Sequence, residues 1–170
     1  LPGTGRVMRR MARITGRTFG EASRWTTTDG TRWSRDRFSE RSYESDIEQQ
    51  LRFAPDGAIR EMVVRGKSPS GDAAETFKTT AGRYAYESTV DHGEGAAKPG
   101  AFYVSFGGTT DSLFVLAEAL AKAPGHAIDL LPTGRATMTP RNTLQVSHAG
   151  RTRTRTGELV SGLELTPFVI

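Results

Sequence analysis

The side chains with the clearest capacity for chemistry are the histidines and the acidic residues beside one of them. His92, His126 and His148 stand apart in the sequence, and none belongs to an HxH or HExxH pattern. Asp91, His92 and Glu94 share a glycine-rich stretch, and this donor set could hold a metal ion. A solvated loop explains the same residues more simply. We therefore expect no cofactor in this chain, and no catalytic residue can be assigned, which leaves open whether it is an enzyme.

A second chemical feature is the run RTRTRT at Arg151–Thr156. Strict alternation in a strand places Arg151, Arg153 and Arg155 on one face and the threonines on the other. Three guanidinium groups in a row could bind phosphates, a carboxylate surface or an acidic partner. The alternative is a solvated edge strand protected by its charge. We favour the solvated strand and regard a nucleic-acid partner as improbable.

Two pairs of glycines could expose backbone amides to an anion. Gly93 and Gly95 flank Glu94, but no helix is expected to follow them. Gly107-Gly108 is better placed, because a helix is expected to begin just after it, where free amides attract negative charge. A strand-to-helix turn explains these glycines equally well.

Residues 101–132 carry the clearest secondary-structure pattern in the sequence. The pattern predicts a strand at Ala101–Phe106, an amphipathic helix at about 111–123 and a strand at Ile128–Leu131. Leu113, Leu116, Ala117 and Leu120 form the apolar stripe of that helix, with Thr110 or Asp111 as its cap. Nearly everything else reads as strand and turn.

Turn signals divide the rest of the chain into hairpins. Asp29-Gly30 predicts one hairpin and Pro55-Asp56-Gly57 another, with a third expected at Ala81-Gly82. We expect loops at Lys67–Ala74 and Asp91–Gly100, and two short strands at Ala136–Met138 and Thr143–Ser147. Residues 6–15 fit either a short helix or an edge strand.

These elements predict a single mainly β domain over residues 1–170. We expect a curved antiparallel sheet, as a half-barrel or a sandwich, covered by the one helix. Such a fold could enclose a pocket, and its expected lining residues come from the aromatic strands and the helix stripe: Tyr84, Tyr86, Phe102, Tyr103, Leu113, Leu116 and Leu120. The simpler interpretation is that these side chains fill a core.

Composition excludes several classes of protein. The chain has 170 residues, a formal charge of +4 and no cysteine, so disulfides and thiolate metal sites are excluded. No apolar run approaches the ~20 residues of a membrane-spanning helix. The basic balance permits an anionic partner, but the arginines are scattered, which favours a solvated surface.

The order of several short motifs resembles the N-terminal, β-rich region of secreted bacterial amidohydrolases of the imidazolonepropionase-like group. These motifs are a G-x-FY strand at Gly100–Tyr103, the helix at Leu113–Ala123, an LLP-x-G turn at Leu130–Gly134, and Gly162-Leu163 followed by Thr166-Pro167. The turns at Asp29-Gly30 and Pro55–Gly57 fit the same layout. The similarity covers residues 100–166 best and the remainder loosely.

The resemblance implies a non-catalytic accessory domain that packs on the catalytic barrel or gates it. The family's metal ligands, an HxH pair with further His and Asp, have no counterpart here, so a divalent metal such as zinc is expected only in the catalytic domain. The partner is then the barrel, in the same polypeptide or as a cleaved partner. The resemblance also implies a periplasmic or secreted protein whose signal peptide has been removed, and the apolar Val169-Ile170 would precede the barrel.

Two alternatives remain. One is a periplasmic half-barrel, similar to lipoprotein carriers, that binds a hydrophobic ligand between sheet and helix. The other is anion or nucleic-acid binding through the face that carries Arg151, Arg153 and Arg155.

Overall fold

The computed structural model describes residues 3–12, 18–40, 43–148, 150–163 and 168–169, which form two sheets and one α-helix. In the first sheet each strand pairs with the next: β1 (Gly3–Ala12), β2 (Thr18–Thr27), β3 (Arg32–Glu40), β4 (Tyr43–Phe53), β5 (Ile59–Ser68), β6 (Gly71–Thr80), β7 (Arg83–Ser88) and β8 (His92–Ala96). The second sheet has the order β13-β12-β11-β10-β9. Its strands are β9 (Phe102–Tyr103), β10 (Ala127–Leu131), β11 (Arg135–His148), β12 (Arg151–Ser161) and β13 (Phe168–Val169).

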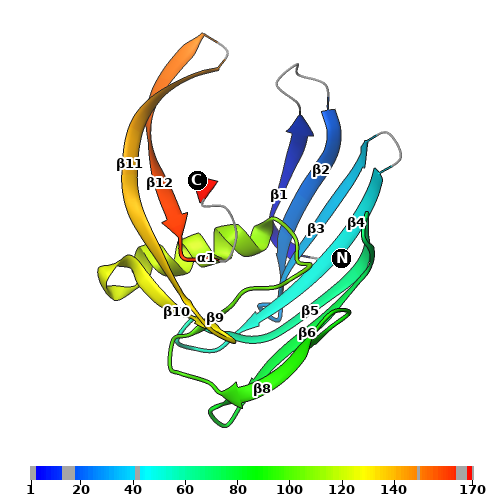
Figure 1. Cartoon of the computed structure of the whole chain (residues 1–170). Coiled ribbons are helices and arrows are strands. Elements are labelled where there is room, and N and C mark those ends of the chain that lie inside the picture. Colours follow the sequence, from blue (N-terminus) through cyan, green and yellow to red (C-terminus); the bar gives the residue numbers. More distant parts are fainter. Residues whose placement is uncertain (1–2, 13–17, 41–42, 149, 164–167, 170) are drawn as a thin grey trace.

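The helix α1 (Asp111–Lys122) and the short 3-10 turn η1 (Pro124–His126) connect β9 to β10. Figure 1 shows α1 lying crosswise in the middle of the view, from the long β11–β12 hairpin toward the strands of the curved first sheet. The expected mainly β fold with one helix is therefore confirmed. The first sheet does not close into a barrel, since β1 and β8 remain its outer strands.

The hairpin predicted at Asp29-Gly30 forms because the turn residues suit it. Gly30 has a φ of +80°, and the Thr31 amide donates to the Asp29 carboxylate at 3.1 Å. In the register that results, Trp25 lies directly opposite Trp33. Their rings stack with centroids 6.0 Å apart, which adds a cross-strand contact to the ladder.

Two segments expected as loops are strands, and both predictions were wrong. At 67–74, β5 continues to Ser68 and β6 begins at Gly71, whose φ of +124° allows a two-residue turn. At 91–100, His92–Ala96 forms β8, in which Gly93 lies beneath the ring of Tyr86. A Cβ at Gly93 would lie 2.8 Å from that ring, so the glycine allows the strand to pair below a tyrosine.

Strand boundaries in the second sheet also differ from the prediction. Only Phe102–Tyr103 of the expected strand 101–106 is extended, and it pairs with β10 in parallel, whereas every other described pairing is antiparallel. The two short strands expected after Pro132 are one strand, β11, with a shift of register between Pro140 and Thr143. One extra residue at this point bends the strand without ending it. The sequence pattern predicted a break between two strands here. Of the undecided segment 6–15, residues 6–12 belong to β1, and residues 13–15 lie outside the described residues.

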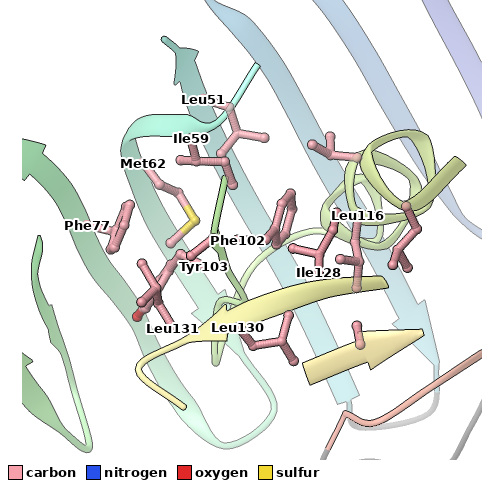
Figure 2. Close-up of a cluster of buried hydrophobic side chains, with 14 of the residues drawn as sticks. Leu51, Ile59, Met62, Phe77, Phe102, Tyr103, Leu116, Ile128, Leu130 and Leu131 are labelled. Carbon is pink, nitrogen blue, oxygen red and sulfur yellow. The ribbon is translucent and has the colours of Figure 1, made fainter. Parts of the chain in front are cut away.

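The core lies where the concave face of the first sheet meets α1 and the second sheet (Figure 2). The Phe77 and Tyr103 rings stack at 4.2 Å, which joins β6 to β9. Leu116 and Leu120 of the helix are fully buried in the same cluster, and each such side chain contributes about 1.5–3 kcal/mol by burial. The two sheets and the helix thus share one hydrophobic core.

Candidate functional site

The polar groups that the fold brings together lie around the loop that leads into α1. Three strands of the first sheet point polar side chains at this loop from the concave face: Ser34 and Asp36 from β3, Gln49 from β4 and Glu75 from β6. All four are buried. Each occupies a position where its strand faces the core, so burial without partners would be costly. Their partners are the backbone and hydroxyl groups of residues 103–112.

Glu75 binds backbone amides at the start of the Gly107-Gly108 turn, where an anion site was one of two interpretations of the sequence. Its carboxylate accepts hydrogen bonds from the backbone amides of Phe106 and Gly107, each at 3.0 Å, and from the Tyr103 hydroxyl at 2.7 Å. Burial, together with the hydrogen bond to Glu75, raises the pKa of Tyr103 well above its usual value, so the phenol remains a donor. The amides do attract an anion, but the anion is supplied by the chain itself.

Gln49 anchors the next part of the loop. Its Oε1 accepts from the Thr109 amide at 3.2 Å and from the Ser112 hydroxyl at 2.7 Å, while the hydroxyls of Ser34 and Thr109 lie 2.6 Å apart. A Cβ at Gly108 would collide with Gln49 Oε1, which explains a glycine at that position. The loop is therefore fixed by side chains that are far away in the sequence.

The helix cap differs from the prediction. Neither Thr110 nor Asp111 caps α1 with its side chain; the Thr110 amide instead donates to Asp36 Oδ2 at 2.7 Å. The carboxylate of Asp111 is occupied by Arg32, whose Nε and Nη2 donate to it at 2.7 and 2.9 Å. Arg32 also reaches Glu118 at 2.8 Å, and Arg24 contacts both acids at 3.5 Å. These ion pairs hold the helix on β2 and β3.

Burial makes Asp36 sensitive to pH. Desolvation raises the pKa of Asp36 above 3.8, and the hydrogen bond from the Thr110 amide offsets only part of this effect. The folded protein thus binds this proton more tightly than the unfolded chain. Its contribution to stability is present at low pH and is lost as the pH rises through the folded-state pKa.

We expect Asp36→Asn to remove this dependence, because the amide keeps an acceptor for Thr110 and does not titrate. Relative to wild type, the variant should gain unfolding free energy as the pH rises from the ordinary aspartate pKa of 3.8 through the raised folded-state pKa of Asp36. Urea denaturation at several pH values measures the difference. Other carboxyls, such as Asp46, titrate in both proteins and cancel from it. Parallel stability curves for the two proteins would contradict the prediction.

The three weak candidates for metal ligands, Asp91, His92 and Glu94, do not form a cluster. Asp91 accepts from the Tyr86 hydroxyl at 2.8 Å, Glu94 pairs with Arg83 at 3.4 Å, and His92 is exposed on β8. Among the described residues no group of three His, Cys, Asp or Glu side chains is arranged to hold a metal ion. His126 contacts the Leu120 carbonyl at the end of α1, at 3.2 Å.

The residues expected to line a pocket mostly pack in the core. Tyr86, Phe102, Tyr103, Leu116 and Leu120 are buried in the core cluster, and Tyr84 is packed against it. Leu113 is partly buried and lies outside that cluster. Of this set, Phe102 borders a hollow.

That hollow is a groove of about 620 Å³ beside the second half of α1. Phe102, Val115 and Ile128 contribute apolar surface, and charged residues such as Lys122 and Asp129 also line it. No sequence pattern predicted this groove, because its walls come from segments that are far apart in the chain. These are the β4–β5 turn, residues 99–102, the helix and β10. The mixture of apolar and charged lining suits a small amphiphilic molecule.

The three arginines of β12 lie away from these features. Arg151, Arg153 and Arg155 are exposed near the tip of the β11–β12 hairpin (Figure 1). The threonines between them are exposed as well, so this part of the hairpin is open to solvent on both faces.

No helix in the described part of the chain is long and apolar enough to cross a membrane. Comparisons of the sequence with protein-family models and with curated proteins, and of the fold with solved structures, gave no match.

Proposed function

We propose that this chain is the non-catalytic N-terminal domain of a secreted, metal-dependent amidohydrolase, and that it packs against the catalytic barrel. The observation that carries the proposal is the order of motifs over residues 100–166 that resembles the imidazolonepropionase-like group. In this proposal a divalent metal such as zinc belongs to the catalytic domain, and the whole protein is exported to the periplasm or beyond.

The roles of the motif residues support a structural rather than a chemical function. Phe102 and Tyr103 are buried in the core, as are Leu130 and Leu131 before the turn at Gly134. Gly162 has a φ of +87°, and a Cβ there would collide with the Arg135 carbonyl. Thr166 and Pro167 lie outside the described residues. The motif residues therefore pack β9, α1 and β10 against the β11–β12 hairpin. This packing role supports an accessory domain of fixed shape.

The test has a genetic part and a biochemical part. The reading frame of the source gene should continue past the codon for Ile170 into an apolar strand that carries an HxH pair; a stop codon at that point would overturn the proposal. The 170-residue chain, assayed with zinc against a panel of dipeptides and N-acyl amino acids, should show no hydrolysis. Turnover by this chain would refute the non-catalytic role.

The groove beside α1 favours a second candidate function, the binding of a small amphiphile as in a carrier protein. Val115 and Ile128 would contact its apolar part, and Lys122 would lie near an anionic head group. Native mass spectrometry and titration with a fluorescent fatty acid test this candidate. Saturable binding that Lys122→Glu weakens, in a variant that circular dichroism shows to be folded, would support it, whereas no retained lipid and no titration would exclude it.

A further inference from the structure

Among the described residues, β12 has a neighbouring strand on its outer edge along only a short part of its length. On one side β12 pairs with β11 from Arg151 to Ser161. On the other side the described residues supply only β13, which pairs at Leu159 and Val160. From Arg151 to Glu158 the backbone amides and carbonyls of this edge therefore have no described strand beside them. A two-stranded ribbon is marginally stable alone, and an open edge is a template for another strand.

On this stretch Thr154 and Thr152 hydrogen-bond to Gln145 and Ser147 of β11, whereas the arginine side chains are unpaired among the described residues. Several other described arginines form ion pairs: Arg24, Arg32, Arg35, Arg37, Arg52, Arg83 and Arg135. Arg151, Arg153 and Arg155 are exposed and have no hydrogen bond or ion pair with a described residue. The register places Leu144 of β11, itself exposed, opposite Arg155. One face of the hairpin thus joins three free guanidinium groups to an apolar side chain.

We propose that this edge of β12 binds an extended acidic segment of a protein as an added antiparallel strand. Residues two apart in a strand are separated by about 6.6–6.8 Å, so carboxylates at alternate positions of the segment match the three arginines one by one. Directly opposite residues in an antiparallel pair point to the same face, which brings each carboxylate beside a guanidinium. The backbone supplies affinity and the arginines supply selectivity.

The direction of the bound segment along β12 follows from the pairing of β13. This short strand shows that the edge accepts an antiparallel neighbour, and a segment running in the same direction passes Glu158 first and Arg151 last. The charges disfavour a second copy of the chain, because pairing two such edges concentrates positive charge. No Phe, Tyr or Trp occurs in residues 143–156, so the stacking surface typical of single-stranded nucleic-acid sites is missing. The inference uses the hairpin alone and is independent of the proposed function.

Synthetic peptides test the inference with the whole 170-residue chain. The probe is a fluorescent, end-capped TEVEVET peptide, followed by anisotropy at low ionic strength. The first control, TVEEEVT, has the same composition but groups its carboxylates. The second is TEVEVET with methyl groups on the backbone nitrogens that face the edge, which keeps the charge and removes the hydrogen bonds. We expect TEVEVET to bind more tightly than either control by about tenfold or more.

Variants locate the binding site. The triple variant Arg151→Gln, Arg153→Gln and Arg155→Gln should weaken TEVEVET binding by about tenfold or more. The matched control removes three exposed positive charges from β5, at Arg60, Arg65 and Lys67, and should bind as wild type does. Circular dichroism confirms that the variants fold. Absent binding, equal binding of the three peptides, equal loss in both variants, or tighter binding of a single-stranded oligonucleotide would each overturn the inference.

Discussion

Replacing Arg32 with alanine is expected to lower the free energy of unfolding by about 3–5 kcal/mol, because it leaves a buried charge without its partner. The side chain of Asp111 is 6% exposed and that of Arg32 16%, and two hydrogen bonds of 2.7 and 2.9 Å join them. Arg24, 3.5 Å away, is too distant to replace the bidentate contact. Urea denaturation followed by circular dichroism measures the loss.

The matched control is Arg83→Ala, which breaks an ion pair between side chains that are 64% and 74% exposed. Such a pair contributes about 1 kcal/mol or less, since water screens both charges. A double variant, Arg32→Met with Asp111→Leu, should recover much of the lost stability, because it removes both buried charges together. If Arg32→Ala costs no more than Arg83→Ala, the pair does not hold the helix.

Glu75→Ala is expected to cost about 3–5 kcal/mol, since it leaves the buried Tyr103 hydroxyl and two partly buried amides without their common acceptor, at about 1–3 kcal/mol for each unpaired group, partly relieved by relaxation. The carboxylate is 3% exposed and binds Tyr103, Phe106 and Gly107 at 2.7 to 3.0 Å. The loop before α1 should loosen with it. Urea denaturation gives the energy, and faster amide exchange at Phe106 and Gly107 reports the loop.

A graded series separates this role from general damage to the core. Tyr103→Phe removes one hydroxyl and should cost about 1 kcal/mol. Glu75→Gln keeps the volume but turns one acceptor into a donor, so its cost should fall between the two. Glu87→Ala, on the exposed side of β7, should be nearly neutral. Equal costs for Glu75→Gln and Glu75→Ala would mean that charge matters and the individual hydrogen bonds do not.

The positions of Gln49 and Glu75 within their strands are visible in the sequence as polar residues on apolar faces. Gln49 lies between Ile47 and Leu51, and Glu75 lies between Ala73 and Phe77, at the spacing of two that marks one face of a strand. A polar side chain on an apolar face indicates either a partner across the core or a site. Which loop supplies the partner is invisible in the sequence, because the contacts join residues 28 to 63 positions apart.

Turns and the helix were predictable where the contacts that form them join residues close together in the sequence. The Asp29-Gly30 hairpin, the turn at Gly57 and the helix at Asp111–Lys122 each follow from neighbouring residues, and all three are present. The errors lie where a distant strand outweighs local preference. Polar, glycine-rich residues at 91–100 suggested a loop, but pairing with β7 and the rings of Tyr84 and Tyr86 makes a strand of Gly93 and Gly95.

The sequence by itself predicted a mainly β chain with one amphipathic helix and the alternation that places Arg151, Arg153 and Arg155 on one face of a strand. These features depend on periodicity and on groups only a few residues apart. Only the tertiary structure decided that Glu75 binds the amides of Phe106 and Gly107, that Asp36 accepts from the amide of the N-cap residue Thr110 and that Arg32 binds Asp111. Each of these contacts depends on the curvature of the first sheet. That curvature brings together side chains that are far apart along the chain, so no local sequence pattern predicts their contact.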